Sequence, residues 1–330
     1  MRAHMKIRGL MLALAVLFLS ACARLNAQGS QPLPAALPTA RKSQTAADLT
    51  TSPTPSPTAR RAPTRTPSPT VTATRTPSLT PTLPPDWVYH PAGAVAVPIL
   101  LYHRVTDRAA ANRYAVSTAA FRAQMKFLAE QGYATASVSQ LAAVIRDGGY
   151  LPVKPIVITF DDGFVDVYEN AFPILQEYGF RATVYVITGV LETNLSYGYM
   201  QPDALKELAD AGWEIGSHSV SHSDLKTSPL GMGVELDQSK QDLEARLGVE
   251  VRSFAYPFAA ANDWIKEQVS RHGYTSAVGV GTLNRHTLKS LYFLSRREIY
   301  NNTSLAAFQK LLILPPEPTA TPTSAQTTPP

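Results

Sequence analysis

The chain has 330 residues, with 30 Lys and Arg, 25 Asp and Glu, and one cysteine. A single cysteine excludes an intramolecular disulfide. Residues 1–95 hold ten of the basic and two of the acidic residues. Subtracting them leaves residues 96–330 with 20 basic and 23 acidic residues, a net charge of −3. The folded region therefore has no basic excess, and we expect no nucleic-acid partner.

The chain begins like a secretory signal peptide. Basic residues at positions 2, 6 and 8 precede an apolar run from 10 to 19, which is too short to span a membrane. The run ends in Leu19-Ser20-Ala21-Cys22, which resembles a bacterial lipobox. The resemblance implies a signal peptide over residues 1–22, lipidation of Cys22, and an extracytoplasmic protein anchored to the membrane. The alternative is a signal helix that happens to contain a cysteine.

Residues 23–90 are predicted to be a disordered linker. They are rich in Ser, Thr, Pro and Ala, and ten of the 27 prolines fall between Pro53 and Pro85. This composition buries too little apolar area to offset the entropy of ordering. Fully extended, about 60 residues at ~3.1 Å each could reach nearly ~200 Å from a membrane. Such a tether suits an enzyme that searches a wall or matrix; a passive spacer is equally compatible. Residues 315–330 repeat the Pro/Thr pattern and are predicted to be a disordered tail.

Residues 91–314 alternate short β-rich runs with helical patterns. Phe121, Met125 and Leu128 recur at helical spacing, and Gly132 is placed to end that helix. The remaining expected segments, in chain order, are a strand at Val97–Tyr102, a strand at Ile156–Phe160, a helix at Ala171–Tyr178, a strand at Thr183–Ile187, a helix at Pro202–Ala211, a strand at Trp213–Ser217 and a helix at Leu236–Leu247, with Phe254–Tyr256, Trp264–Arg271, Ala277–Val280, Leu294–Tyr300 and Leu305–Leu314 completing the alternation.

Repeated strand–helix units predict an α/β fold with a parallel sheet and helices outside it. Six or more such units in one domain favour a closed or nearly closed barrel over a doubly wound sheet. No G-x-G-x-x-G fingerprint follows a strand in the sequence, which speaks against a dinucleotide-binding fold.

Two motifs follow predicted strands. Asp161 and Asp162 come directly after the strand at 156–160, and His218 follows the strand at 213–217, with His222 four residues later. In a barrel, functional groups sit at the C-terminal strand ends. One carboxylate and two imidazoles form a three-ligand set with open positions, as catalytic zinc requires, and a second acid lies beside it. Asp-Asp-Gly alone is a common turn, and a lone His is more often a loop residue, but together they favour metal-assisted hydrolysis.

These motifs resemble those of the polysaccharide deacetylase superfamily, the family-4 carbohydrate esterases. The resemblance covers residues 97–312 and rests on the segments 97–105, 159–163, 212–222 and 253–258. It implies a distorted (β/α)7, TIM-like barrel. It also implies that Asp161 is the general base and that Asp162, His218 and His222 bind a divalent metal, with zinc as the expected ion. The segment Tyr256-Pro257-Phe258 is expected to contact substrate, and a backbone N–H near Phe258 to hold the oxyanion.

The sequence departs from the family pattern at two places. Ala259 stands where a glycine usually follows the third motif, and its methyl group is expected to narrow the loop around the oxyanion. No late Leu-x-His motif, the usual source of the general acid, appears after Ala277. His286 is a poor substitute in a polar loop. His103, just past the first strand, is a better candidate for the acid or for a substrate contact; a structural histidine at the barrel rim is the alternative.

Arg296 resembles an arginine near the end of related domains that orients the base Asp161. Its neighbour Arg297 is the alternative inward residue, because strand register cannot be fixed from sequence.

The leading hypothesis is a monomeric, metal-dependent N-deacetylase that acts on an N-acetylated glycan outside the membrane, such as peptidoglycan, poly-N-acetylglucosamine or a chitin-like polymer. One alternative is an O-acetyl esterase on xylan or a similar polymer. Another is a catalytically impaired glycan-binding module, suggested by Ala259 and the missing late histidine. A non-haem iron oxygenase also uses two His and one carboxylate, but its usual His-x-Asp pairing is absent from the sequence.

Overall fold

The structure is a computed structural model that describes residues 86–109, 111–193, 198–227 and 229–314. The predicted signal peptide with Cys22, nearly all of the predicted linker and the predicted tail lie outside these residues. Within the described residues, no helix is both long and apolar enough to cross a bilayer.

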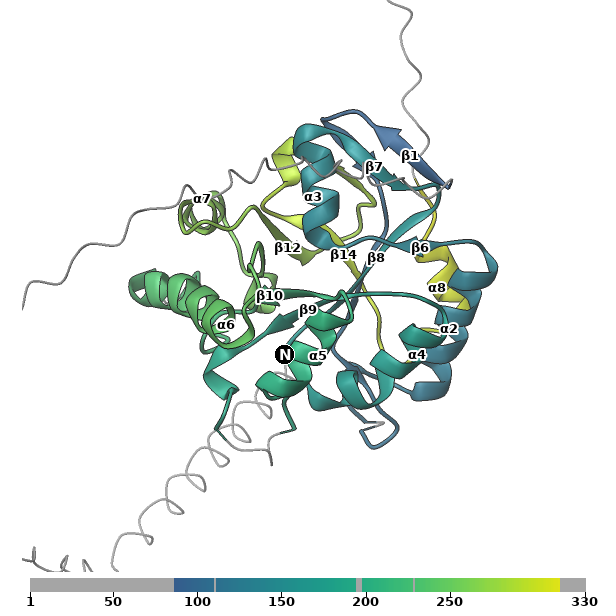
Figure 1. Cartoon of the computed structure of the whole chain (residues 1–330), viewed down its shortest axis with the longest axis horizontal. Coiled ribbons are helices and arrows are strands. Elements are labelled where there is room, and N and C mark those ends of the chain that lie inside the picture. Colours follow the sequence, from purple (N-terminus) through teal and green to yellow (C-terminus); the bar gives the residue numbers. More distant parts are fainter. Residues whose placement is uncertain (1–85, 110, 194–197, 228, 315–330) are drawn as a thin grey trace, which may run out of the picture. The chain divides into compact units, whose positions relative to one another are not determined.

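Among the described residues, seven parallel strands close into a barrel, which confirms the predicted fold class (Figure 1). The last strand in the ring pairs with the first, Ile99 with Val157 and Tyr102 with Phe160. In order around the barrel the strands are β3 (Ile99–Tyr102), β14 (Leu294–Glu298), β12 (Ser276–Val280), β11 (Ser253–Ala255), β10 (Glu214–Ser217), β9 (Thr183–Val186) and β8 (Pro155–Phe160).

Helices surround the strands (Figure 1). They are α2 (Thr118–Glu130), α3 (Val138–Asp147), α4 (Phe172–Glu177), α5 (Pro202–Asp210), α6 (Ser239–Leu247), α7 (Asp263–Arg271) and α8 (Leu305–Leu311). Helix α2 shows how local sequence sets the bounds. The Ser117 side chain accepts the Ala120 N–H at its start, and Gly132 takes a left-handed φ of 75° just past its end. Its apolar stripe, including Phe121 and Leu128, is fully buried.

Helix α3, which was not among the expected segments, closes the N-terminal end of the barrel. At its first residues, the Val138 N–H bonds Thr183 and the Ser139 N–H bonds Glu214, and these partners begin β9 and β10. The buried face of α3 belongs to one apolar cluster with Val157 and other side chains that point into the barrel. Because this end is sealed, the opposite end is left for function.

Short strands complete the domain. β1 (Trp87–His90) pairs antiparallel with β7 (Gly149–Pro152), and β2 (Ala94–Ala96) pairs antiparallel with β13 (Arg285–Thr287). β4 (Arg104–Val105) pairs with β5 (Ala115–Val116), and β6 (Ala134–Thr135) adds to β8. The prediction that residues up to 90 belong to the linker is therefore wrong for β1, because these residues form a backbone ladder with β7.

Strand alternation decides which side chains face the inside of the barrel. In β8, Ile156, Ile158 and Phe160 pack outward in the same cluster as the helices. Val157 packs in the inner cluster instead, so Thr159 and then Asp161 continue the inward side. The same alternation in β14 places Leu294 and Arg296 inside.

Candidate metal centre and active site

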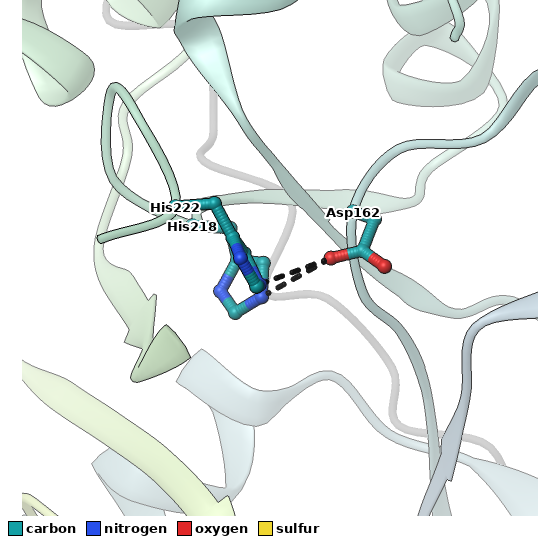
Figure 2. A group of neighbouring side chains, drawn as sticks. All are labelled: Asp162, His218 and His222. Atoms are coloured by element: carbon teal, nitrogen blue, oxygen red, sulfur yellow. Dashed lines mark ion pairs between the residues drawn. The ribbon is translucent and has the colours of Figure 1, made fainter. Parts of the chain in front are cut away.

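The sequence motifs meet at the C-terminal ends of the barrel strands. Asp161 and Asp162 follow β8, His218 follows β10, and His222 lies four residues further on in an irregular loop rather than on a helix. Figure 2 shows the Asp162 carboxylate pointing at both imidazole rings. The structure thus brings together the three predicted metal ligands.

The Asp162 backbone makes this convergence possible. Consecutive residues of a regular strand point to opposite faces, which would send Asp162 outward, away from Asp161. Asp162 instead has a left-handed φ of 71°, followed by Gly163 at 77°. The turn swings the Asp162 carboxylate back toward the cavity, so two neighbouring carboxylates reach one site from different directions. Non-glycine residues in this region are uncommon and cluster at functional sites.

The three side chains fit a divalent metal. The Nε2 atoms of His218 and His222 each lie 3.4 Å from Asp162 Oδ1, and the possible ligand atoms all lie within 4.8 Å of one another. Asp162 Oδ1 is buried and has no hydrogen-bond partner among the described residues. A buried carboxylate oxygen without a partner, facing two imidazole nitrogens, is the donor set that a cation would satisfy.

The environment of His218 prepares it as a ligand. Its Nδ1 lies 2.8 Å from the Ala255 carbonyl oxygen, so Nδ1 carries the proton and Nε2 presents a lone pair to the site. Burial alone lowers the pKa of His218, but the charges of Asp161 and Asp162 outweigh burial and raise it. Burial and the nearby His218 lower the pKa of His222. In Asp162, burial raises the pKa, but the influence of the nearby His218 outweighs burial and lowers it.

Asp161 has a different partner. Arg296 Nη1 and Nη2 donate to its two carboxylate oxygens at 2.6 and 2.7 Å, inside the barrel. Burial raises the pKa of Asp161, but the guanidinium charge outweighs it and lowers the pKa to about 2. Arg296 also donates from Nε to the Gly279 carbonyl and from Nη1 to Thr159 Oγ1. It is Arg296, and not the partly exposed Arg297, that the structure brings to Asp161.

His103 lies on the wall of the same cavity. Its ring packs on Tyr114 with 4.6 Å between centroids, and its buried Nδ1 has no hydrogen-bond partner in the described part of the chain. His286 lies elsewhere, fully buried in β13, with Nε2 3.0 Å from the Val97 carbonyl oxygen. Burial lowers the pKa of His286 to about 4. His103 can reach a substrate in the cavity, whereas His286 serves the structure.

The third motif forms a strained turn beside His222. Phe258 and Ala259 both have left-handed φ, 58° and 52°, and the exposed Phe258 ring lies edge-on to the His222 ring at 4.7 Å. No acceptor among the described residues takes the Phe258 N–H. Tyr256 lines the cavity, but its hydroxyl donates to the Tyr292 carbonyl. Pro257 is buried in the turn and does not line the cavity.

One cavity of about 510 Å³ joins these groups. Its walls include four residues that were not predicted to belong to the site: Leu101, Tyr114, Val280 and Glu298. Glu298 could have been found, because it lies two residues after Arg296 on β14 and so shares the inward side. Tyr114 could not, because it lies in a connection without a periodic pattern.

Comparisons with known proteins show similarity to polysaccharide deacetylases. The model of the polysaccharide deacetylase family matches residues 148–277. The Bacillus subtilis protein YxkH, named for this family, is 28% identical over 218 residues, which span 64% of this chain and 74% of that protein. The poly-beta-1,6-N-acetyl-D-glucosamine N-deacetylase of Escherichia coli (strain K12) is 28% identical over 64% of this chain, but over only 38% of its own length.

Solved structures show the same relationship. The Streptococcus pyogenes deacetylase PplD, in complex with acetate, superposes with a TM-score of 0.60 at 27% identity, covering 68% of this chain and all of that one. BC0361, a polysaccharide deacetylase from Bacillus cereus, superposes with a TM-score of 0.59 at 28% identity, covering 67% of this chain and 70% of that one. The described region of this chain is therefore similar to polysaccharide deacetylases in sequence and in fold, in keeping with the resemblance of its motifs.

Proposed function

We propose that the chain is a metal-dependent N-deacetylase that removes acetyl groups from an N-acetylated glycan outside the membrane. One observation carries the proposal: Asp162 Oδ1, which has no hydrogen-bond partner among the described residues, lies 3.4 Å from two imidazole nitrogens and beside a second carboxylate that Arg296 keeps ionised. The two carboxylates, the two imidazoles and Arg296 all line one cavity. Peptidoglycan, poly-N-acetylglucosamine and chitin-like oligomers are the candidate substrates, and the similarity to poly-beta-1,6-N-acetyl-D-glucosamine N-deacetylases supports the second of them.

The three ligands would be Asp162, His218 and His222, with zinc the expected ion. A divalent metal held there supplies Lewis-acid chemistry, polarising an acyl carbonyl and making water more acidic. Asp161, with a pKa of about 2, is deprotonated at any physiological pH and can accept the proton of the attacking water. Arg296 fixes both of its oxygens and so limits the directions from which that proton can arrive.

Two further groups complete the reaction. The Phe258 N–H, which lacks an acceptor among the described residues, would donate to the oxyanion that forms on the carbonyl. His103 would donate a proton to the leaving nitrogen, because an amine is a poor leaving group until it is protonated. This need for an acid favours an amide substrate over an ester, whose alcohol leaves more readily. An O-acetyl esterase and an impaired glycan-binding module remain the competing functions.

The proposal is tested by acetate release from defined N- and O-acetylated oligosaccharides, with metal content measured on the same samples. Asp162→Ala and His222→Ala should lose metal and activity together. Asp161→Asn should keep the metal and lose turnover. Turnover near the wild-type rate in Asp161→Asn would show that Asp161 is not the base. A chain that binds zinc but releases acetate from none of the glycans would be a binding module instead.

We also propose that Cys22 is lipidated and that residues 23–85 tether the domain to the membrane. The lipobox-like sequence and the Pro/Thr-rich composition support this location. Metabolic labelling with a radioactive fatty acid tests it, because Cys22→Ser should abolish the label and release the protein from the membrane fraction.

A further inference from the structure

The segment that carries both histidine ligands has an unfavourable backbone. Between His218 and His222 the chain is irregular, and two of its five residues, Ser219 and His222, have left-handed φ values of 66° and 57°. L-residues rarely adopt this conformation unless surrounding contacts hold it. Within the segment, the His222 N–H donates to Ser219 Oγ at 3.0 Å. That internal contact does not fix the segment relative to the barrel. From outside the segment, the Thr188 and Gly189 N–H groups donate to the Ser219 and Val220 carbonyl oxygens at 3.1 and 2.8 Å. The N–H groups of Val220 and Ser221 need a further partner.

Glu235 is that partner. It lies in a π-helical turn, Val234–Gln238, that leads into α6. Its Oε2 accepts the backbone N–H groups of Val220 and Ser221, each at 2.9 Å, and its Oε1 accepts the Ser221 hydroxyl at 2.5 Å. Hydrogen bonds to an ionised carboxylate are stronger than neutral ones. Glu235 therefore clamps the two residues that immediately precede His222.

The same turn braces the other end of the segment. Ser239, the first residue of α6, donates to the Glu235 carbonyl at 2.6 Å, and its Oγ lies 2.7 Å from Ser217 Oγ. Ser217 Oγ in turn accepts the Ser219 N–H at 3.2 Å. The carboxylate of Glu235 thus holds the residues between the two histidines, and its backbone carbonyl is linked through Ser239 to Ser217, directly before His218. Both carboxylate oxygens are used in these bonds, so Glu235 is not itself a ligand.

We propose that Glu235 is a positioning residue for the metal centre, which holds the segment 218–222 in the conformation where both imidazoles reach one ion. The inference rests on the proposed metal site. Partners that orient metal ligands typically contribute 10–100-fold to metal affinity. We therefore expect Glu235→Ala to weaken zinc binding by about 10–100-fold, mainly through a poorly held His222.

The substitutions can be graded by the bonds they remove. Glu235→Gln keeps a carbonyl oxygen for the two backbone N–H groups, and its amide can donate to Ser221 Oγ, so its zinc affinity should stay within a few-fold of the wild type. Ser221→Ala removes the hydroxyl bond to Glu235 and the contact with Ser223 Oγ, but keeps both backbone N–H bonds, and should have an intermediate effect. Glu244→Ala is the matched control. Glu244 lies on α6 and accepts the Val251 N–H at 3.0 Å, but contacts no predicted ligand.

The experiment is competition of the full chain with a chromophoric chelator for zinc, together with thermal unfolding of the metal-free proteins. The expected order of zinc affinity is wild type and Glu244→Ala, then Glu235→Gln, then Ser221→Ala, then Glu235→Ala. Activity measured against zinc concentration should show the same shift in half-activation, and excess zinc should restore much of the turnover. A merely structural role would lower the unfolding temperature without moving zinc affinity.

Wild-type zinc affinity in Glu235→Ala would overturn the inference. If that variant does not fold, Ser221→Ala decides, because its side chain is exposed and its loss should be tolerated; unchanged affinity there would also overturn it. Failure of the wild-type chain to bind zinc would instead contradict the proposed function, and the two failures are thereby distinguished.

Discussion

Replacing Arg296 with methionine removes the only cation that bonds Asp161 among the described residues, while keeping most of the volume of the side chain. The pair is deeply buried, with side-chain exposures of 1% for Arg296 and 4% for Asp161. The pKa of Asp161 falls from its ordinary 3.8 to about 2, which corresponds to roughly 2–3 kcal/mol in favour of the carboxylate. This free energy already includes the opposing effect of burial, so the arginine alone favours the carboxylate by more than this amount. Removing one partner of a buried pair typically costs about 3–5 kcal/mol, and we expect that loss here.

The measurement is urea unfolding of the chelator-treated protein, so that no metal alters the charge at the site. Arg297→Met is the matched control, because its side chain is partly exposed and has no ionic partner among the described residues; it should cost less than about 1 kcal/mol. The folded pKa of Asp161 lies below its unfolded value, so the stability it adds is present above about pH 4 and is lost as pH falls toward 2. The gap between wild type and Arg296→Met should narrow over that range. Equal losses in the two arginine variants would refute the reasoning.

Two other predictions concern the third motif and the buried histidine. Ala259→Gly should stabilise the protein by about 0.5–1 kcal/mol in urea unfolding, because glycine adopts the left-handed φ of 52° without steric cost; a loss of stability would count against strain at this turn. Burial lowers the pKa of His286 to about 4. As the pH falls, His286 is therefore protonated in the unfolded chain before it is protonated in the folded protein. The free energy of unfolding should fall by about 3 kcal/mol between pH 6.5 and pH 4. His286→Gln retains a donor for the Val97 carbonyl and should flatten that pH dependence; an unchanged slope would assign it to other groups.

The elements with strong periodicity were predictable from sequence. The run Ile156–Phe160 lies inside β8 (Pro155–Phe160), and the helix around Phe121 and Leu128 is α2. Both predictions are correct because the apolar residues recur with the same period as the buried face of the strand or helix. The convergence of Asp162, His218 and His222 was also predictable, since parallel strands deliver their C-terminal ends to one side of a barrel. Asp162 and His218 are far apart in the sequence, but the order of the parallel strands brings them together.

Other features depend on tertiary contacts that no local pattern encodes. Helix α3 has an ordinary amphipathic pattern, but nothing in it indicates that it closes the barrel by bonding Thr183 and Glu214. The choice between Arg296 and Arg297 needed the register of β14, since a shift of one residue exchanges the faces. The role of Glu235 required knowing that a π-helical turn passes the histidine segment.

The two adjacent carboxylates obtain different chemistry from one backbone torsion. If residue 162 continued the strand, its carboxylate would leave the cavity; if both carboxylates faced the same partner, their like charges would raise one pKa. The left-handed φ at Asp162 avoids both outcomes. Asp161 remains on the inward side, where Arg296 neutralises it, and Asp162 turns to the imidazoles. Repulsion from Asp161 is accordingly the smallest of the influences on the pKa of Asp162, behind burial and the histidines. Two adjacent carboxylates can therefore serve the proposed roles of proton acceptor and metal ligand, because each faces a different partner.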